Sequence, residues 1–195
     1  MPLSIATDDL TIYTLPRDGD IARRDFLALL HNPGETWLAD FGFTDAGLVA
    51  EMEQADTAMV PGHAILDRSQ SAGHTERVVL ASMLPLLKHW DVTISTAGPD
   101  SRSPSQIMHN KVMIVRATDG GQAWCWLGSI NFSMSGWLEA NTAVRFRSDA
   151  YAAVFIAWFE RTRDWARLHI PQPAPVVPSG VTLVPAVAAV IAEGA

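Results

Sequence analysis

Four polar residues, arranged as two pairs, could together carry out chemistry on a phosphate group. His109 and Lys111 are two residues apart in IMHNKVMIV, and Ser129 and Asn131 are two residues apart in GSINFS. If both segments are strands, the two members of each pair point to the same side, because side chains alternate between faces. A histidine can attack phosphorus, a lysine supplies positive charge, and serine and asparagine donate hydrogen bonds to phosphate oxygens. The spacing alone also fits an ordinary strand histidine and an ordinary Gly-Ser turn.

The elements around these pairs indicate an α/β fold. Segments 107–116 and 123–127 flank Asp119-Gly120-Gly121, a strong turn signal, and are expected to form a hairpin that holds both pairs. Further strands are expected at 10–15, 37–43, 63–66, 92–94 and 143–146, and helices at 20–30, 45–55 (capped by Thr44 or Asp45), 78–87 and 149–168. Strands that alternate with helices predict a layered sandwich, in which a central mixed β-sheet is flanked by helices.

Composition sets limits on the domain organisation and the partners. The chain has 195 residues, of which 48% are hydrophobic, so one folded domain over 1–170 and a Pro/Ala-rich arm or tail over 171–195 are expected. A net charge of −7 argues against broad affinity for nucleic acid, which depends on many Lys and Arg contacts to phosphate. The single cysteine, Cys125, excludes an intramolecular disulfide and a cysteine metal cluster. No signal peptide and no apolar stretch of the required ~18 residues is visible, so a cytoplasmic protein without stable membrane insertion is expected.

The full pattern of the two pairs resembles a known family. His109-x-Lys111 followed by Gly128-Ser129-x-Asn131 is similar to the signature of the phospholipase D superfamily. The phrase IMHNKVMIV…GSINFS resembles the single-motif (HKD), endonuclease-like branch of that superfamily. FGFTDAGLVAEM and ILDRSQSAG are similar to upstream segments of the same family, so the resemblance extends over about residues 37–159.

The resemblance implies a mechanism without metal or cofactor. One histidine attacks phosphorus to give a covalent phosphohistidine, and a second histidine protonates the leaving oxygen. Since this chain has a single His-x-Lys motif, the resemblance implies a homodimer in which a two-fold axis brings two copies of His109 into one cleft. Lys111 and Asn131 would then bind the phosphodiester substrate, and Ser129 would support them through hydrogen bonds.

Two positions depart from the family pattern. Arg116 stands where the family has Asp, five residues after the lysine, and Thr142 stands where the branch has Glu, eleven residues after the asparagine. A histidine without a carboxylate partner is less well fixed in its tautomer. We therefore expect Asp119, Glu139 or a backbone carbonyl to accept a hydrogen bond from the ring of His109.

Three functions are compatible with the sequence. The first is a phosphodiesterase that acts on nucleic acid, as the branch resemblance implies. The second is a phospholipid hydrolase or phosphatidyltransferase, which would need an exposed apolar patch near the cleft. The third is a catalytically weakened binding module, which the departures at Arg116 and Thr142 would favour.

Other residues are candidates for the site or for structural roles. The loop Asp67-Arg68-Ser69-Gln70 follows a strand, so it could line the mouth of the cleft or simply form a capped loop. The remaining histidines have no partner at a meaningful spacing and are expected to be structural or exposed; they are His31, His63, His74, His89 and His169. The tryptophans are expected in the core, on the buried face of a helix or at a dimer interface; those singled out are Trp124, Trp126, Trp158 and Trp165.

Overall fold

The computed structural model describes residues 6–7, 9–31, 33–71, 74–85, 87–96, 98–99 and 106–172. These residues form one eight-stranded sheet with helices on both of its faces. The strands are β1 (Ala6–Thr7), β2 (Leu10–Thr14), β3 (Thr36–Asp40), β4 (Gly62–Asp67), β5 (Trp90–Ser95), β6 (Lys111–Val115), β7 (Trp124–Gly128) and β8 (Thr142–Arg147). The helices are α1 (Gly19–Ala28), α2 (Ala46–Thr57), the short 3-10 helix η1 (Arg68–Ser71), α3 (His74–Met83) and α4 (Asp149–His169).

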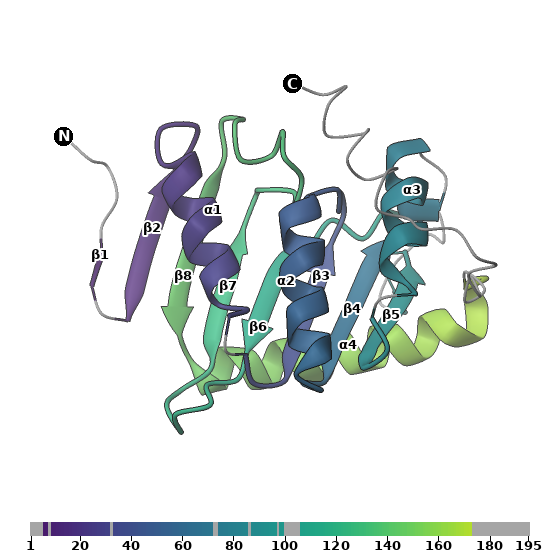
Figure 1. Cartoon of the computed structure of the whole chain (residues 1–195). Helices are drawn as coiled ribbons and strands as arrows, with labels where there is room; N and C mark the ends of the chain where they lie inside the picture. The colour runs from purple at the N-terminus through teal and green to yellow at the C-terminus, as the bar shows by residue number, and fades with distance from the viewer. Residues whose placement is uncertain are drawn as a thin grey trace.

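The sheet is mixed, in the order β1-β2-β8-β7-β6-β3-β4-β5. Neighbouring strands from β1 across to β3 are antiparallel, whereas β3, β4 and β5 are parallel to one another. Helices α1, α2 and α3 cover one face of the sheet, and α4 crosses the other face (Figure 1). The prediction of a layered α/β sandwich with a central mixed sheet is confirmed, and so is the hairpin formed by β6 and β7.

Each face of the sheet has its own apolar core. On the side of α1, the ring of Trp126 stacks on Tyr13 and meets Phe26 edge-on, with a centroid distance of 5.1 Å in both pairs. On the other side, α4 buries a stripe at helical spacing; it consists of Ala152, Phe155, Phe159, Thr162 and Ala166. Val154 of the same helix lies outside this stripe, and its side chain is 72% exposed.

Helix α3 lies earlier in the chain than expected. It spans His74–Met83, whereas the sequence predicted a helix over 78–87. Pro85 accounts for the early end, since proline has no N–H to donate and disfavours a helical conformation at the residue before it. Leu84 still donates its backbone N–H to the carbonyl of Leu80 across the last turn.

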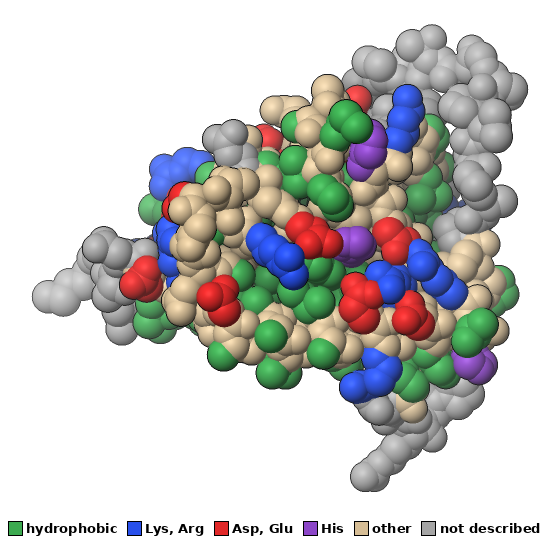
Figure 2. All heavy atoms as spheres, turned by 90° about the horizontal axis from the view of Figure 1, so that it is seen from below, with side chains coloured by type: hydrophobic (Ala, Val, Ile, Leu, Met, Phe, Trp, Pro, Cys, Tyr) green, Lys and Arg blue, Asp and Glu red, His purple; other side chains and the backbone are tan. Residues whose placement is uncertain are grey.

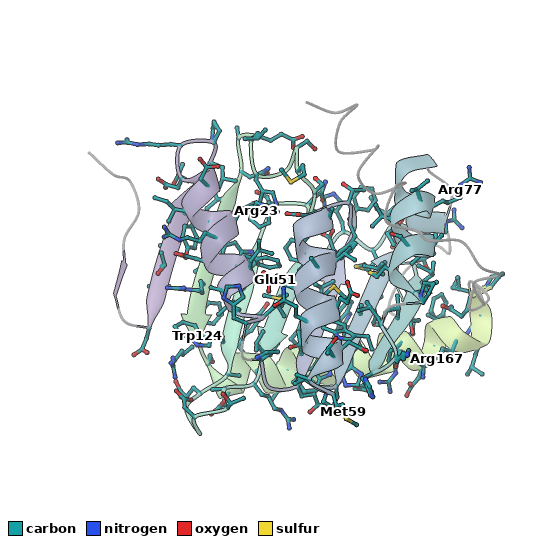
Figure 3. All side chains as sticks on the ribbon, in the orientation of Figure 1. Arg23, Glu51, Met59, Arg77, Trp124 and Arg167 are labelled. Atoms are coloured by element: carbon teal, nitrogen blue, oxygen red, sulfur yellow. The ribbon has the colours of Figure 1, made fainter. Side chains whose placement is uncertain are left out.

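A buried carboxylate joins three separate segments beside α2. Asp45 is fully buried and accepts hydrogen bonds from the backbone N–H of Gly47 and of Leu48, so it caps α2 as predicted. It also accepts two hydrogen bonds of 2.8 Å from Arg23 of α1 and one of 2.8 Å from Nε1 of Trp137. Figure 3 shows Arg23 between α1 and α2. Asp45 therefore holds α1, α2 and the segment between β7 and β8 together.

Gln172, three residues after the end of α4, is hydrogen-bonded to the outer strand β5. The side chain of Gln172 accepts a hydrogen bond of 2.8 Å from the backbone N–H of Ile94 in β5 and donates one of 3.0 Å to its carbonyl. Most of the expected arm, 171–195, lies outside the described residues, so the arm remains a prediction. None of the helices described is long and apolar enough to cross a membrane.

Candidate active site

Four strands have an end at the site, which lies along the edge of the sheet that is formed by strand ends and not by an outer strand. β3, β4 and β7 end there and β6 begins there, because β6 is antiparallel to both β3 and β7. Lys111 is the first residue of β6, and His109 precedes the strand by two residues. Ser129 and Asn131 directly follow β7. The fold thus brings all four sequence-predicted residues to the same edge, which is the upper edge of the sheet in Figure 1.

His109 is an exposed side chain on the approach to β6. Its ring packs on that of Phe41, with 4.9 Å between the centroids and 48° between the planes. Partial desolvation and the nearby charge of Lys111 lower the pKa of His109, while Asp67 acts in the opposite direction. A lowered pKa keeps the imidazole neutral near pH 7, and a neutral ring nitrogen is the form that can attack phosphorus.

Lys111 is the buried cation of the site. Its side chain is 4% exposed, and Nζ donates a hydrogen bond of 3.1 Å to the carbonyl of His109. Nζ also lies 5.3 Å from the centroid of the Phe41 ring. Burial lowers the pKa of Lys111, and the neighbouring Asp40 and Asp67 raise it. Among the described residues none forms a direct ion pair with Lys111, so its charge can act on an anionic ligand.

Asp67 fixes the segment that carries the histidine. Its carboxylate is fully buried and accepts hydrogen bonds of 2.7 Å from the backbone N–H of Met108 and 2.9 Å from that of Ser69. The bond to Met108 ties the segment before β6 to the end of β4. The capped-loop interpretation is confirmed, because Asp67 caps η1. That the loop lines the mouth of a cleft stays a prediction.

The Ser129 and Asn131 side chains have different surroundings. Ser129 Oγ donates a hydrogen bond of 3.0 Å to Asn141 Oδ1 and accepts one of 3.1 Å from the backbone N–H of Thr142. Asn131 lies against Gly42, where an added Cβ would be only 3.1 Å from Asn131 Cγ. Its Oδ1 atom is buried, and no described residue is hydrogen-bonded to it. Ser129 therefore stabilises the segment after β7 through its hydrogen bonds, and the Asn131 amide packs at the end of β3.

The two family departures lie in very different places. Arg116 follows the far end of β6, about 17 Å along the strand from Lys111. There it forms an ion pair of 3.3 Å with Glu35 and lies over the ring of Trp37. Thr142 begins β8 at the site edge and supports Ser129 through its backbone. Arg116 is therefore part of the opposite end of the sheet and does not reach the candidate site of its own chain.

The expected acceptor for the His109 ring is not found. Asp119 lies in the turn at the far end of the hairpin, where it bonds to the backbone of Gly121 and lies 4.0 Å from Arg147. Glu139 is exposed and makes no such bond. Within the described part of the chain, no carboxylate or carbonyl is hydrogen-bonded to the His109 ring, so this expectation is wrong. The carboxylate that acts on His109 is Asp67, which the sequence placed only at the cleft mouth.

Because Arg116 is remote, we expect Arg116→Ala to leave the kcat/KM for phosphodiester hydrolysis within about twofold of wild type. The loss of its ion pair with Glu35, which is solvent-exposed, should lower stability by no more than about 1 kcal/mol. Steady-state kinetics and thermal melts measure both effects. A loss above about tenfold in a variant that melts like wild type would show instead that Arg116 takes part in the reaction.

The remaining histidines and tryptophans have structural surroundings. Four histidine rings lie near an acceptor, with contacts of 2.8–3.3 Å; they are His31 with Glu51, His63 with Glu35, His89 with Asp56 and His169 with Trp165. The side chain of His74 lies outside the described part. Trp126 is in the core, and Trp124 lies beneath the guanidinium groups of Arg145 and Arg147.

The surface at the end of the molecule opposite the site carries basic and acidic side chains next to one another (Figure 2).

Comparisons with known proteins agree with this architecture. A family model described as "Cardiolipin synthase, PLD-like domain" matches residues 28–165. The fold is similar to NucT from Helicobacter pylori, with a TM-score of 0.68 and 14% identity over 80% of this chain and 96% of that one. It is similar to Nuc, a phospholipase D family member from Salmonella typhimurium, with a TM-score of 0.63 and 18% identity over 81% and 95% of the chains.

A third solved structure resembles the chain over only part of its own length. It is a phosphatidylserine synthase from Haemophilus influenzae Rd KW20, with a TM-score of 0.60 and 12% identity over 96% of this chain and 46% of that one. No curated protein sequence matches the chain. Since the family model covers well over half of the residues, the chain belongs to the phospholipase D superfamily.

Proposed function

We propose that this chain is a metal-independent phosphodiesterase that forms a covalent phosphohistidine on His109. The observation that carries the proposal is the buried Lys111, which has no direct ion pair among the described residues, beside a histidine whose pKa is lowered. A buried cation of this kind is stabilised when an anion binds, and Asn131 and Ser129 lie at the same edge of the sheet. The arrangement fits a phosphate, whose charge Lys111 would compensate.

Hydrolysis proceeds in two steps. In the first, a neutral ring nitrogen of His109 bonds to phosphorus and the bond to the leaving oxygen breaks, while a second histidine gives that oxygen a proton. In the second, the now neutral second histidine takes a proton from water, the water oxygen bonds to phosphorus, and the phosphorus–nitrogen bond breaks. Lys111 and Asn131 stabilise the negative charge on the non-bridging oxygens in both steps.

The second histidine comes from another copy of the chain. No other histidine side chain of the described part lies at this edge, and exposed apolar side chains lie on the segments that carry the candidate residues. Ile107, Met134 and Leu138 are 50%, 54% and 67% exposed. Large exposed apolar side chains near a site indicate a contact surface. We therefore propose a two-fold homodimer with both copies of His109 facing one phosphate.

Leu138→Asp is expected to disrupt this dimer and to lower kcat/KM by at least about tenfold, because a buried unpaired carboxylate costs several kcal/mol at an interface. Val154→Asp, at a 72% exposed position on α4, is the matched control and should stay dimeric and active. Light scattering after size-exclusion chromatography gives the mass of each variant. A wild-type protein that is active as a monomer would contradict the dimer.

Nucleic acid is the substrate that we propose first. The segments IMHNKVMIV and GSINFS resemble the endonuclease-like branch of the superfamily. The net charge of −7 then implies that binding depends on the local charge of Lys111 and not on a broad basic surface.

A phospholipid is the second candidate, and one cavity favours it. The cavity has a volume of about 610 Å³ and lies beside the segment that carries His109, with Asp67 and Ser69 on its polar side. Its apolar lining is aliphatic and consists of Ile94, Ile107, Ile170 and Pro171. Nucleobases are generally held by aromatic stacking, whereas an aliphatic wall suits an acyl chain. A catalytically weakened binding module is the remaining alternative.

One assay separates these functions. Purified protein is incubated with excess EDTA and with bis(p-nitrophenyl) phosphate, single-stranded DNA or cardiolipin. The proposal predicts turnover of the small diester and of DNA in the presence of EDTA. Turnover of cardiolipin alone would favour the phospholipid hydrolase, and loss of all turnover on chelation would overturn the metal-independent mechanism. A dimeric protein that binds DNA without cleaving it would be a binding module.

A further inference from the structure

A second carboxyl group is buried directly beside the lysine of the site. Asp40 is the last residue of β3 and is the register partner of Lys111 in β6. Its side chain is fully buried, and Oδ2 accepts a hydrogen bond of 3.1 Å from the backbone N–H of Phe132. Its other oxygen, Oδ1, is buried without a hydrogen-bond partner among the described residues. A carboxyl group that is fully buried at a strand end is costly unless its oxygens are well hydrogen-bonded, so its presence needs an explanation.

We propose that Asp40 is a positioning residue of the phosphate site, which holds the Asn131 turn against β3 and controls how much of the Lys111 charge reaches the substrate. This inference rests on the proposed function of the site. Asp40 does not touch the reacting atoms, so it acts through Lys111 and Asn131.

The positioning role follows from the contacts of Phe132. Its N–H is held by Asp40, and its carbonyl accepts hydrogen bonds of 2.9 and 3.0 Å from the backbone N–H groups of Thr44 and Asp45. The backbone N–H and the carbonyl of Phe132 are therefore both hydrogen-bonded to the segment from the end of β3 to the start of α2. Asn131, the residue before it, is pressed against Gly42 of the same segment. The Asn131 amide is placed by these contacts and not by β7 alone.

The burial of Asp40 is the reason why it would control the charge that Lys111 presents to the substrate. Desolvation raises the pKa of Asp40 to about 8, although the N–H of Phe132 and the charge of Lys111 pull it down. The other titratable groups of the cluster are Asp67 at the end of β4 and His109 before β6. Below about pH 8 Asp40 is a neutral acid, and the Lys111 charge is free to act on a phosphate. Above it, the ionised Asp40 neutralises Lys111 and repels the phosphate.

A proton on Asp40 also fits the pattern of unsatisfied atoms. Oδ1 of Asp40 and Oδ1 of Asn131 are both buried and lack a well-aligned donor among the described residues, although the backbone N–H groups of Phe41 and Gly42 lie near enough to Asp40 to lower its pKa. An ionised carboxylate cannot donate, whereas a protonated one has an O–H group. Protonation removes the negative charge of Asp40, which lowers the cost of burying its carboxyl group.

The test is the pH dependence of KM in wild type and in Asp40→Asn. Asparagine keeps the oxygen that accepts from Phe132 but cannot ionise. Between about pH 6.5 and about pH 8.5, a range chosen to limit the loss of the proton from Lys111 itself, wild-type KM should rise about fourfold, whereas KM of Asp40→Asn should stay within about twofold. Asp56→Asn, which changes another buried aspartate away from the site, should follow wild type. An equal rise in wild type and Asp40→Asn would overturn the inference.

A binding measurement separates this inference from the proposed activity. Tungstate is a tetrahedral oxyanion whose charge is constant from neutral to alkaline pH, so its affinity reports the charge of the site. Calorimetry should show that wild type loses about fourfold in tungstate affinity between about pH 6.5 and about pH 8.5, and that Asp40→Asn changes by less than about twofold. This result without any phosphodiester turnover would support the role of Asp40 and refute the hydrolase. Turnover with a pH-independent tungstate affinity in wild type would refute the role of Asp40 alone.

The pH dependence of the melting temperature gives a third test, because its expected direction follows from the raised pKa of Asp40. A carboxyl group whose pKa is raised on folding stabilises the folded state fully below its unfolded pKa, and this contribution is lost as pH rises through the folded value of about 8. Asp40→Asn should therefore gain in melting temperature relative to wild type as pH is raised from about 6 to about 9. A difference that does not change with pH would contradict a neutral, buried Asp40.

Discussion

His109→Ala is expected to lower kcat/KM for phosphodiester hydrolysis by at least about a thousandfold, which corresponds to about 4 kcal/mol of transition-state stabilisation. The imidazole is the group that bonds to phosphorus, and in a two-fold dimer the same substitution also removes the acid that protonates the leaving oxygen. Because the side chain is exposed and has no hydrogen bond through its ring to a described residue, the variant should fold normally. Single-turnover kinetics with the small diester measure the loss.

Substitutions of the same residue types elsewhere provide the controls. His31→Ala removes an exposed histidine from the opposite end of the molecule and should leave activity unchanged. Lys111→Ala should cost about a hundredfold, because the charge that binds phosphate is lost while the nucleophile remains. Lys88 is the other lysine of the chain, and Lys88→Ala should be near neutral. Appreciable turnover by His109→Ala would rule out His109 as the nucleophile.

Asp45→Ala is expected to destabilise the fold by about 3–5 kcal/mol, because it leaves a partly buried guanidinium and a buried indole N–H without an acceptor. The substitution removes the hydrogen bonds to Arg23 and Trp137 and the cap of α2 together. Urea unfolding monitored by circular dichroism gives the free energy of unfolding.

Two matched variants show which part of this loss belongs to the buried network. Asp164→Ala removes a 65% exposed carboxylate that is paired with Arg163, and it should cost less than about 1 kcal/mol. Asp45→Asn keeps an acceptor for the cap of α2 but loses the charge that faces Arg23, so its stability should lie between that of Asp45→Ala and wild type. An Asp45→Ala variant as stable as Asp164→Ala would mean that Asp45 does not hold α1 and α2 together.

Much of the fold could be predicted from local patterns. The cap at Asp45 and the β6–β7 hairpin depend on a few neighbouring residues, so the sequence contains the whole signal for each. The start of α3 could not be predicted in this way. It begins at His74, inside a polar segment with no apolar periodicity, and the helix stops before Pro85. The helix α4 itself was predicted, but the small residues Ala152 and Ala166 of its buried stripe carry no strong apolar signal in the sequence.

The site was predicted in its residues but not in its supporting carboxylates. Asp119 and Glu139 were expected near His109 because each lies three residues from a position where the family has a carboxylate, whereas strand direction places Asp119 at the opposite end of the sheet. Asp67 approaches from β4, and only the tertiary fold brings it to Met108. A signal for Asp40 was present, because a carboxylate inside the apolar run WLADFGF is as costly to bury as Lys111. Its partner could not be known without the register of β3 and β6.

The most direct test of the central claim is to trap the covalent intermediate. Wild-type protein is mixed with the small diester in EDTA, quenched with denaturant at alkaline pH, where phosphohistidine survives, and digested for mass spectrometry. The account predicts an adduct with the mass of the transferred phosphoryl ester on the peptide that contains His109, lost on acid treatment and missing in His109→Ala. Turnover without an adduct, or an adduct on any other residue, would contradict a mechanism in which His109 attacks phosphorus.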